Sequence, residues 1–347
     1  MQKKLIYLMV LIVLSLTFWI YRTSNLQYKN TIITFQHSKK YINHVILSPS
    51  NATCLNPQHL LIIVTSYVGH VELRSAHRRA MPADYLASKN TSRIFLLAKI
   101  PSAERYITQS AIEDEHKIYG DILQGSFYEH YRNLTYKHLM GLQWASTCHT
   151  AFILKVDDDT VFNFDLTINF LSKVPTQDQF IMGYVLNNTL PRRNRENKWY
   201  VTMEEYPGQL YPPYLSGWYY IISPKTAASI SNEAQYHPYF WIDDILVTGI
   251  LTEYLGIKLH RLPKDFWLEY YEQVECCLRD MIKKNIQCDF IVGPNGGRNN
   301  LLVEFNEGYK NCNNCVKRKQ KLRDTCIMNR DRAIFSDGIG VVNKVIL

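Results

Sequence analysis

Glycine and proline are scarce in this chain of 347 residues, with 15 and 13 occurrences respectively. This scarcity excludes a collagen-like or low-complexity chain. Acidic residues are missing from positions 1–50, which carry six lysines and arginines. A second basic stretch covers residues 310–332, so the formal charge of +8 comes from the two ends and the remainder is slightly acidic. We therefore expect no nucleic-acid partner.

An apolar run without charge covers residues 5–21 and directly follows Lys3 and Lys4. A helix of this length spans about 25 Å, the short end of what crosses a bilayer. No small residues of a signal-peptide cleavage site follow, and Trp19 and Tyr21 suit the membrane interface. We predict an uncleaved anchor that leaves residues 1–4 in the cytosol and the rest in the lumen; the alternative is a cleaved signal peptide.

Sequons and cysteines agree with a lumenal body. The four N-glycosylation sequons begin at Asn51, Asn90, Asn133 and Asn187. Eight cysteines suit an oxidising compartment, and most of them lie late in the chain, where we expect disulfides. The Cys312-x-x-Cys315 spacing also fits half a zinc site, but no second pair of cysteines or histidines follows it.

The body follows a polar segment at residues 22–57, which we interpret as a stem. Short apolar runs at 60–65, 93–98 and 151–156 predict buried strands of a parallel sheet, and the spacing over 134–144 predicts a helix. Strands that alternate with helices indicate an α/β fold. We therefore expect a lumenal catalytic domain over 58–347, with a Cys- and Lys-rich C-terminal appendage from about residue 276.

Three consecutive aspartates, Asp157, Asp158 and Asp159, directly follow the third predicted strand. Ligands of open α/β sheets gather at the carboxyl ends of strands. Adjacent carboxylates repel one another, and a divalent cation bridging to phosphate oxygens would relieve that repulsion. The alternative is a solvated acidic turn or a helix cap. An EF-hand is excluded, because its glycine and distal glutamate spacing is absent.

A second acidic pair, Asp243 and Asp244, begins an apolar helical run. We interpret it as the source of a general base for an attacking hydroxyl, with helix capping as the alternative. The segment 211–220 between the two acidic sites is rich in tyrosine and contains Trp218. It predicts either a sugar-stacking surface or an aromatic core. A metal-held diphosphate, a base and aromatic rings together indicate glycosyl transfer from a nucleotide sugar.

Further motifs recur in a fixed order over about residues 55–270. They are Arg74-Ser-Ala76-His-Arg78, Phe95-Leu96-Leu97, Tyr119-Gly-Asp121-Ile122-Leu123, Tyr131-Arg-Asn133-Leu134-Thr135-Tyr-Lys137, Lys155-Val-Asp157-Asp158-Asp159, Tyr211-Pro-Pro-Tyr214-Leu-Ser216-Gly217 and Asp243-Asp244-Ile245. The chain thereby resembles the β1,3-galactosyltransferase family (glycosyltransferase family 31). The resemblance implies a GT-A-type nucleotide-sugar transferase fold, a type II Golgi membrane enzyme, and an inverting reaction that gives a β1,3 linkage.

The resemblance also implies a UDP-sugar donor held by a divalent cation, usually Mn²⁺. We expect Asp157 and Asp159 to bind the cation, and Asp157 and Asp158 to contact the donor. Asp244 stands at the aspartate of the family's E-D-V motif and is the predicted base, with Asp243 beside it. The residues expected to bind the donor from the remaining motifs are Arg74, Arg78 and Lys137.

This chain departs from the family pattern at several positions. Trp218 and Tyr219 replace small residues, and the segment 290–295 lacks the late histidine that ligates the metal in many members. His260 is the nearest candidate for that ligand. Transfer of N-acetylglucosamine or N-acetylgalactosamine instead of galactose, and a non-catalytic lumenal chaperone or lectin, are the alternative functions. The motifs leave the acceptor and the oligomeric state open.

Overall fold

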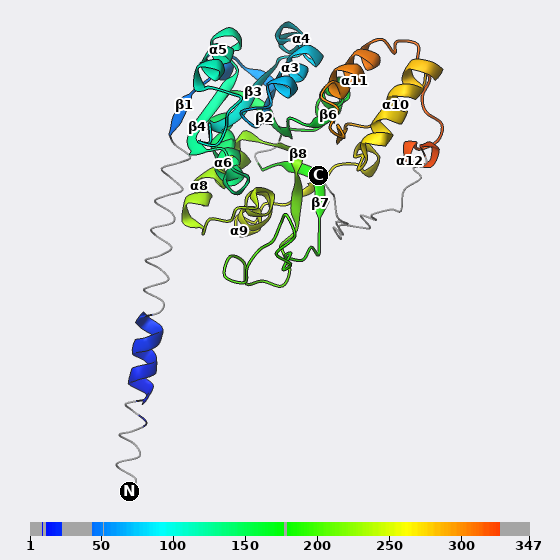
Figure 1. The fold of residues 1–347 in the computed structure, drawn as a ribbon. Coiled ribbons are helices and arrows are strands. Elements are labelled where there is room, and N and C mark those ends of the chain that lie inside the picture. The colour runs from blue at the N-terminus through cyan, green and yellow to red at the C-terminus, as the bar shows by residue number, and fades with distance from the viewer. Residues whose placement is uncertain (1–8, 10–11, 23–43, 51, 177–178, 327–347) are drawn as a thin grey trace.

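The computed structural model describes residues 9, 12–22, 44–50, 52–176 and 179–326 (Figure 1). Residues 12–22 are helical, and apolar side chains such as Phe18 and Trp19 are exposed on them. No described helix is long and apolar enough to cross a membrane. The predicted tail at 1–4, residues 5–8 and 10–11 of the predicted anchor, and 23–43 of the predicted stem lie outside the described residues. The anchor therefore stays a prediction.

An eight-stranded mixed sheet forms the centre of the body, in the order β1-β4-β3-β2-β5-β8-β7-β9. Strands β4, β3, β2 and β5 run parallel, and β8 joins β5 antiparallel. The strands are β1 (Val45–Leu47), β2 (Gln58–Thr65), β3 (Thr91–Lys99), β4 (Ile122–Tyr128), β5 (Thr150–Asp157), β7 (Ile181–Leu186), β8 (Tyr214–Ile222) and β9 (His260–Arg261). Strands β2, β3 and β5 confirm the three predicted strands and their parallel pairing.

The central strands are buried on both faces, because successive side chains of a strand point to opposite sides. In β2, Leu61 and Ile63 belong to one apolar cluster, whereas Leu60, Ile62 and Val64 belong to another. All five side chains are fully buried. The sheet therefore separates two cores, as the continuous apolar runs in the sequence predict.

Helices cover both faces of the sheet (Figure 1). The first face carries α6 (Leu134–Ser146), α8 (Pro224–Glu233), the π-helical turn η3 (Ile245–Ile250) and α9 (Leu251–Tyr254). The second face carries α3 (Val71–Ala80), α4 (Ala83–Ser88), α7 (Phe164–Leu171), α10 (Tyr271–Lys284) and α11 (Leu301–Lys310). The other helices are α2 (Ala52–Leu55), α5 (Gln109–Tyr119), α12 (Leu322–Thr325), η1 (Tyr131–Asn133), η2 (Ala234–Tyr236) and η4 (Lys264–Phe266). Helix α6 confirms the helix predicted over 134–144.

The folded body begins earlier than the sequence indicates. Strand β1 pairs with β4 at the edge of the sheet, although both β1 and α2 lie within the predicted stem at 22–57. Cys54 of α2 forms a disulfide with Cys148 after α6. Residues from Val45 onward are therefore held to the body by strand pairing and by a covalent bond.

The C-terminal segment is part of the second core, whereas the sequence suggested an appendage from about residue 276. Strand β10 (Val292–Pro294) pairs with β6 (Thr160–Phe162), and α11 packs against α3. Buried apolar residues such as Phe290 and Phe305 join the cluster of the central strands. The expected disulfides are present and pair Cys276 with Cys326, Cys277 with Cys288, and Cys312 with Cys315. The last of them leaves no free thiol for zinc at the Cys-x-x-Cys spacing.

Candidate active site

A cavity of about 800 Å³ opens where β2 and β5 end. Its walls also come from β8, from the residues before η3, and from the connection between β7 and β8. Ligands of open α/β sheets bind at this edge, outside the carboxyl ends of the strands. The aspartates at 157–159 and the acidic pair at 243–244 all line this cavity. The fold thus brings together the two carboxylate groups that the sequence indicates separately.

Asp158 holds the turn after β5 in place. It is 7% exposed, its carboxylate Oδ2 lies 2.9 Å from Nδ1 of His70, and its carbonyl oxygen lies 3.0 Å from Nε2 of His77. Its backbone N–H donates to the carbonyl of Thr65 at 3.1 Å. Burial alone would raise the pKa of Asp158, but the hydrogen bond and charge of His70, the hydrogen bond of Ser66 and the charge of His77 together outweigh burial and lower the pKa. The carboxylate is engaged with His70, so its contact with the donor stays a prediction.

Asp157 and Asp159 have different surroundings. The Asp157 carboxylate pairs with the buried Lys155, whose Nζ lies 2.5 Å from Oδ1 and also donates to the carbonyl of Gly217 at 2.5 Å. The Asp159 side chain is exposed and makes no ion pair within the described part of the chain. Desolvation in the cavity, followed by the charges of Asp157 and Asp158, raises the pKa of Asp159 to about 6. A bound cation would relieve this repulsion.

Asp157 and Asp159 offer two carboxylates at the cavity, which make an incomplete ligand set for a divalent cation. Hard oxygen ligands suit Mg²⁺ or Mn²⁺, and such ions commonly take further ligands from water and substrate phosphates. No third protein ligand comes from His260, which does not line the cavity. Its ring instead stacks on Phe180, with the ring centroids 5.5 Å apart.

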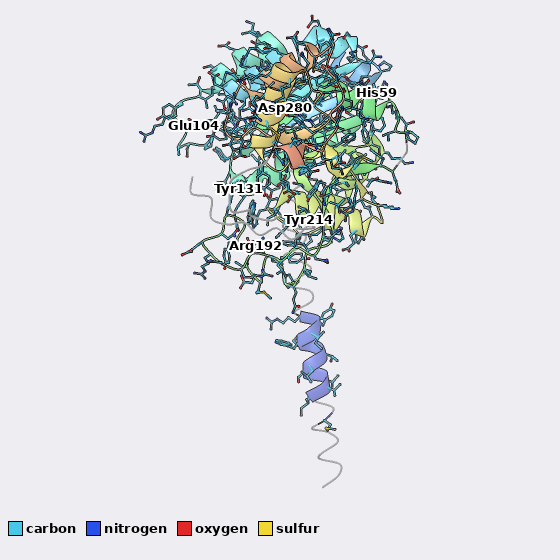
Figure 2. All side chains as sticks on the ribbon, turned by 90° about the vertical axis from the view of Figure 1, so that its right-hand side faces the viewer. His59, Glu104, Tyr131, Arg192, Tyr214 and Asp280 are labelled. Carbon is cyan, nitrogen blue, oxygen red and sulfur yellow. A yellow bond between two sulfur atoms is a disulfide. The ribbon has the colours of Figure 1, made fainter. Side chains whose placement is uncertain are left out.

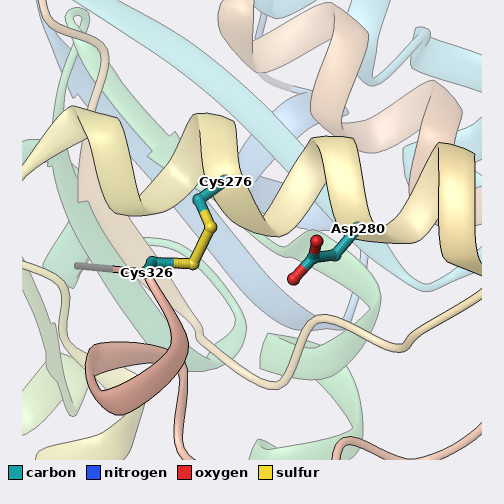
Figure 3. A group of neighbouring side chains, drawn as sticks. All are labelled: Cys276, Asp280 and Cys326. Carbon is teal, nitrogen blue, oxygen red and sulfur yellow. A yellow bond between two sulfur atoms is a disulfide. The ribbon is translucent and has the colours of Figure 1, made fainter. Parts of the chain in front are cut away.

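Among the described residues, three side chains with metal-ligating atoms come close together only at Cys276, Asp280 and Cys326 (Figure 3). The two cysteines are joined in a disulfide, so neither offers a thiolate. Asp280 is paired with Lys284 at 2.9 Å and with Arg318 at 3.0 Å. This group is therefore structural.

Asp244 lies at the start of the π-helical turn, an irregularity that is frequent at functional sites. Its Oδ1 accepts a hydrogen bond from the N–H of Ile245 at 2.9 Å. The close approach of β8 requires glycine at position 217, because a Cβ there would lie 2.9 Å from Cβ of Asp244. Burial, followed by the charge of Asp243, raises the pKa of Asp244 to about 7. A carboxylate with a pKa near neutrality suits general base catalysis.

His138 of α6 supports the acidic pair from inside the protein. Its Nδ1 lies 3.0 Å from Oδ2 of Asp243, and its Nε2 is hydrogen-bonded to the hydroxyl of Tyr220. Burial lowers the pKa of His138, although Asp243 opposes this shift. Burial would raise the pKa of Asp243, but His138 and Lys155 outweigh it and keep this carboxylate ionised. The sequence carries no signal for this role, because His138 is only one of several residues on a helix face.

Arg74 and Arg78, which we expected to bind the donor, do not line the cavity. The fully buried Arg74 pairs with Glu115 at 2.7 Å and donates to carbonyl groups of the segment that follows β2. Arg78 pairs with Asp121 at 2.7 Å and with Glu115 at 2.8 Å. Both guanidinium groups are thus occupied away from the cavity. Arg74 holds the β2–α3 connection, whereas Arg78 ties α3 to α5 and to the residue before β4.

Lys137 does line the cavity, but its charge is neutralised. Its buried ammonium group pairs with Glu129 and donates to the carbonyl of Ser66 at 2.7 Å. His70 of the adjacent connection also lines the cavity, although no pattern in the sequence pointed to it. Lys137 therefore stabilises the β2–α3 connection, which carries His70.

The aromatic segment at 211–220 contributes to both the cavity and the cores, and sugar stacking by its cavity residues stays a prediction. Tyr211, Tyr214 and Trp218 line the cavity, whereas Tyr219 and Tyr220 are fully buried in the two cores. Trp218 packs edge-on against Trp267, with ring centroids 4.2 Å apart. Alternation along β8 places Tyr219 and Tyr220 in different cores, because neighbouring side chains of a strand face opposite ways.

Comparison with known proteins identifies relatives of this chain. The galactosyltransferase family profile matches residues 74–263. Beta-1,3-galactosyltransferase 5 of Gorilla gorilla gorilla is 32% identical over 227 residues, which cover 65% of this chain and 74% of that protein. Human beta-1,3-galactosyltransferase 2 is 31% identical over 241 residues, covering 68% of this chain and 56% of that protein.

Among solved structures, the galactosyltransferase LgtC in complex with donor and acceptor sugar analogs aligns with a TM-score of 0.34 and 12% identity, over 61% of this chain and 76% of that chain. This likeness is too distant to carry a conclusion. The family match covers more than half of the chain and includes both acidic motifs of the cavity. The chain therefore belongs to the galactosyltransferase family, glycosyltransferase family 31, and is a hexosyltransferase.

Proposed function

We propose that this protein transfers galactose from UDP-galactose to an acceptor sugar in β1,3 linkage, with inversion and with help from a divalent cation, usually Mn²⁺. The observation that supports this most is the single cavity with two acidic groups in separate roles. Asp159 is exposed and suited to a cation, whereas Asp244 has a pKa near neutrality and is suited to proton transfer.

Asp157 and Asp159 would hold the cation, which would neutralise the charge that develops on the UDP leaving group. The bond between the galactose C1 and the UDP oxygen breaks, and a bond forms between C1 and the acceptor hydroxyl oxygen. Asp244 takes the proton of that hydroxyl. Asp243, held by His138, keeps a negative charge beside Asp244 and so raises its basicity.

A donor screen tests this proposal directly. The purified full-length protein is incubated with Mn²⁺, a β-galactoside acceptor, and UDP-galactose, UDP-N-acetylglucosamine or UDP-N-acetylgalactosamine in turn, and UDP release and product are measured. We expect transfer from UDP-galactose to be fastest. Faster transfer of an N-acetylhexosamine would contradict the donor, and no turnover with any donor would favour the chaperone or lectin alternative.

We further propose a Golgi membrane location as a single-pass type II protein, with residues 5–21 as the anchor and the catalytic body in the lumen. The apolar run behind two lysines, the sequons and the four disulfides support this arrangement. Disulfides form and persist in the secretory pathway and are rare in the cytosol.

The use of the sequons tests this topology. We expect a glycan on the exposed Asn90, whereas Asn133 donates to the carbonyl of Tyr128 at 2.9 Å and stays poorly modified. Thr135 of the same sequon is fully buried and bonded to the carbonyl of Phe240 at 2.8 Å. Removal of the Asn90 site by Asn90→Gln should increase gel mobility by one glycan, and Asn133→Gln should not. A body without glycans, or a mature N-terminus after residue 21, would refute the topology.

A further inference from the structure

The connection between β7 and β8 forms an ordered wall of the cavity. Arg193 stabilises this connection. Its guanidinium group donates hydrogen bonds to four carbonyls of the connection at 2.7–3.1 Å, those of Val201, Thr202, Tyr206 and Gly208. The N–H of Val201 also donates to the carbonyl of Arg192 at 2.8 Å. The connection therefore presents its remaining side chains in defined places.

Two cations on this wall, Arg192 and Lys198, line the cavity. Neither is paired with a carboxylate anywhere in the ranges that the structure describes. Two lysines that also line the cavity, Lys137 and Lys155, are by contrast neutralised by Glu129 and Asp157. The cavity therefore combines its aspartates with two positive charges that have no carboxylate partner among the described residues.

The two cations lie on the side of the predicted base. The indole N–H of Trp199 donates to the hydroxyl of Tyr131 at 2.8 Å, and Lys198 Nζ lies 4.5 Å from the centre of the Tyr131 ring. The Tyr131 ring lies 5.8 Å from that of Trp241, two residues before Asp243. Aromatic faces of this kind suit the apolar face of a sugar ring.

The hydroxyl of Tyr214 is within the electrostatic influence of both Arg192 and the predicted base Asp244. Burial and then the charge of Asp244 raise the pKa of Tyr214, and the charge of Arg192 opposes that rise. Both charged groups therefore act on the same hydroxyl. Figure 2 shows Tyr131, Arg192 and Tyr214 in one part of the body, and all three line the cavity.

Two buried polar atoms of the same cavity residues lack a partner. They are the hydroxyl of Tyr211 and the indole N–H of Trp241, which have no hydrogen bond within the described chain. Tyr211 is 6% exposed and Trp241 is 5% exposed. Buried polar groups in native proteins are nearly always paired, so unpaired ones at a cavity are compatible with a polar ligand.

We propose that the acceptor is an anionic glycan, whose carboxylate or sulfate group is bound by Arg192 and Lys198 while its ring packs on Tyr131 and Trp199. This proposal rests on the proposed transferase function and names the acceptor class of the same cavity. Arginine binds planar oxyanions through paired hydrogen bonds, and lysine adds a point charge. The anionic group therefore lies against the β7–β8 connection, which carries both cations.

Three acceptors that differ only at C6 test the proposal on the full-length enzyme with saturating UDP-galactose. They are p-nitrophenyl β-galactoside, its 6-O-sulfate, and p-nitrophenyl β-galacturonide. We expect kcat/KM for at least one anionic acceptor to exceed that of the neutral acceptor by about tenfold or more, as a charge-assisted hydrogen bond provides. Which anion is preferred separates a sulfated from a uronic acid acceptor.

The variants Arg192→Gln and Lys198→Gln should each bring the ratio of anionic to neutral kcat/KM toward one. Arg195→Gln is the matched control, because Arg195 lies in the same connection, is exposed and does not line the cavity. It removes one positive charge and should leave the ratio unchanged.

Equal kcat/KM for the three acceptors would overturn the proposal while leaving the transferase function intact. A rise in the KM for UDP-galactose in Arg192→Gln, without a change in the acceptor ratio, would assign the cations to the donor diphosphate and would also overturn it. Absence of UDP release with every acceptor and donor would instead remove the transferase function and the acceptor proposal together.

Discussion

Asp244→Asn is expected to lower kcat by about two to four orders of magnitude, the usual effect of removing a general base. The asparagine side-chain amide is nearly the same size as the carboxylate it replaces, and its oxygen can still accept the hydrogen bond from the N–H of Ile245. The change therefore removes basicity and preserves the shape of the site. The KM for UDP-galactose should change little, because the predicted metal ligands are elsewhere in the cavity. Steady-state kinetics with varied donor and acceptor measure both effects.

The pH dependence of the wild-type enzyme gives a second measurement of the same residue. Because the pKa of Asp244 is raised to about 7, the base is protonated below that pH and ionised above it. We expect kcat/KM to fall as pH decreases through about 7 and to level off above it. The Asp244→Asn variant should lose this inflection.

Stability provides the control for folding. The folded protein binds the Asp244 proton more tightly than the unfolded chain, so the stability that this proton gives is lost as pH rises through about 7. The Asp244→Asn variant escapes this loss, and its Tm at pH 8 should be no lower than that of the wild type. A variant that keeps near wild-type kinetics would move the base to Asp243 or elsewhere, and one that loses donor affinity but keeps turnover would make Asp244 a donor-binding residue.

Asp159→Ala is expected to reduce transfer by about two to three orders of magnitude or more, because it removes one of two carboxylates proposed for the cation. The side chain is exposed and makes no ion pair within the described ranges, so its truncation should leave the fold unchanged. Circular dichroism and thermal unfolding check the fold, and radiolabelled galactose transfer measures the activity.

Metal removal and a matched carboxylate variant accompany this prediction. Excess EDTA should abolish wild-type transfer, and added Mn²⁺ should restore it. Glu269→Gln removes another negative charge from the cavity and should leave the Mn²⁺ concentration for half-maximal activity unchanged, because Glu269 is bonded to Tyr184 at 3.3 Å and is no proposed ligand. Full activity in EDTA or in Asp159→Ala would refute the metal proposal.

Local sequence patterns were sufficient to predict those strands whose burial is evident from the residues of a single segment. The runs at 60–65, 93–98 and 151–156 predict buried parallel strands because both faces of each strand are apolar, and β2, β3 and β5 pair accordingly. The three aspartates directly follow the run 151–156, so the prediction of that strand also predicted that they lie at its carboxyl end, where ligands bind. The boundary of the body was misplaced, because the three-residue β1 and the short α2 are too brief to produce a periodic pattern.

The roles of the buried polar side chains depended on contacts between distant segments. An arginine in a family motif looks the same in sequence whether it faces a ligand or a carboxylate, and the burial of Arg74 against Glu115 is a property of how α3 and α5 pack. His138 meets Asp243 only because α6 and the turn before η3 share one face of the sheet. Such pairings carry no periodicity along the chain.

The sequence by itself therefore determined the α/β class, three strands of the central sheet, the motifs of a family of hexosyltransferases and the two acidic groups, because strand burial and short motifs depend on neighbouring residues. Only the tertiary structure decided that Arg74 and Arg78 pair with carboxylates away from the cavity, and that the C-terminal segment completes a core. It also decided that Arg192 and Lys198 line the cavity without carboxylate partners among the described residues. The physical reason is that burial and pairing of charged side chains are settled by long-range packing, which brings together residues that local propensity treats as independent.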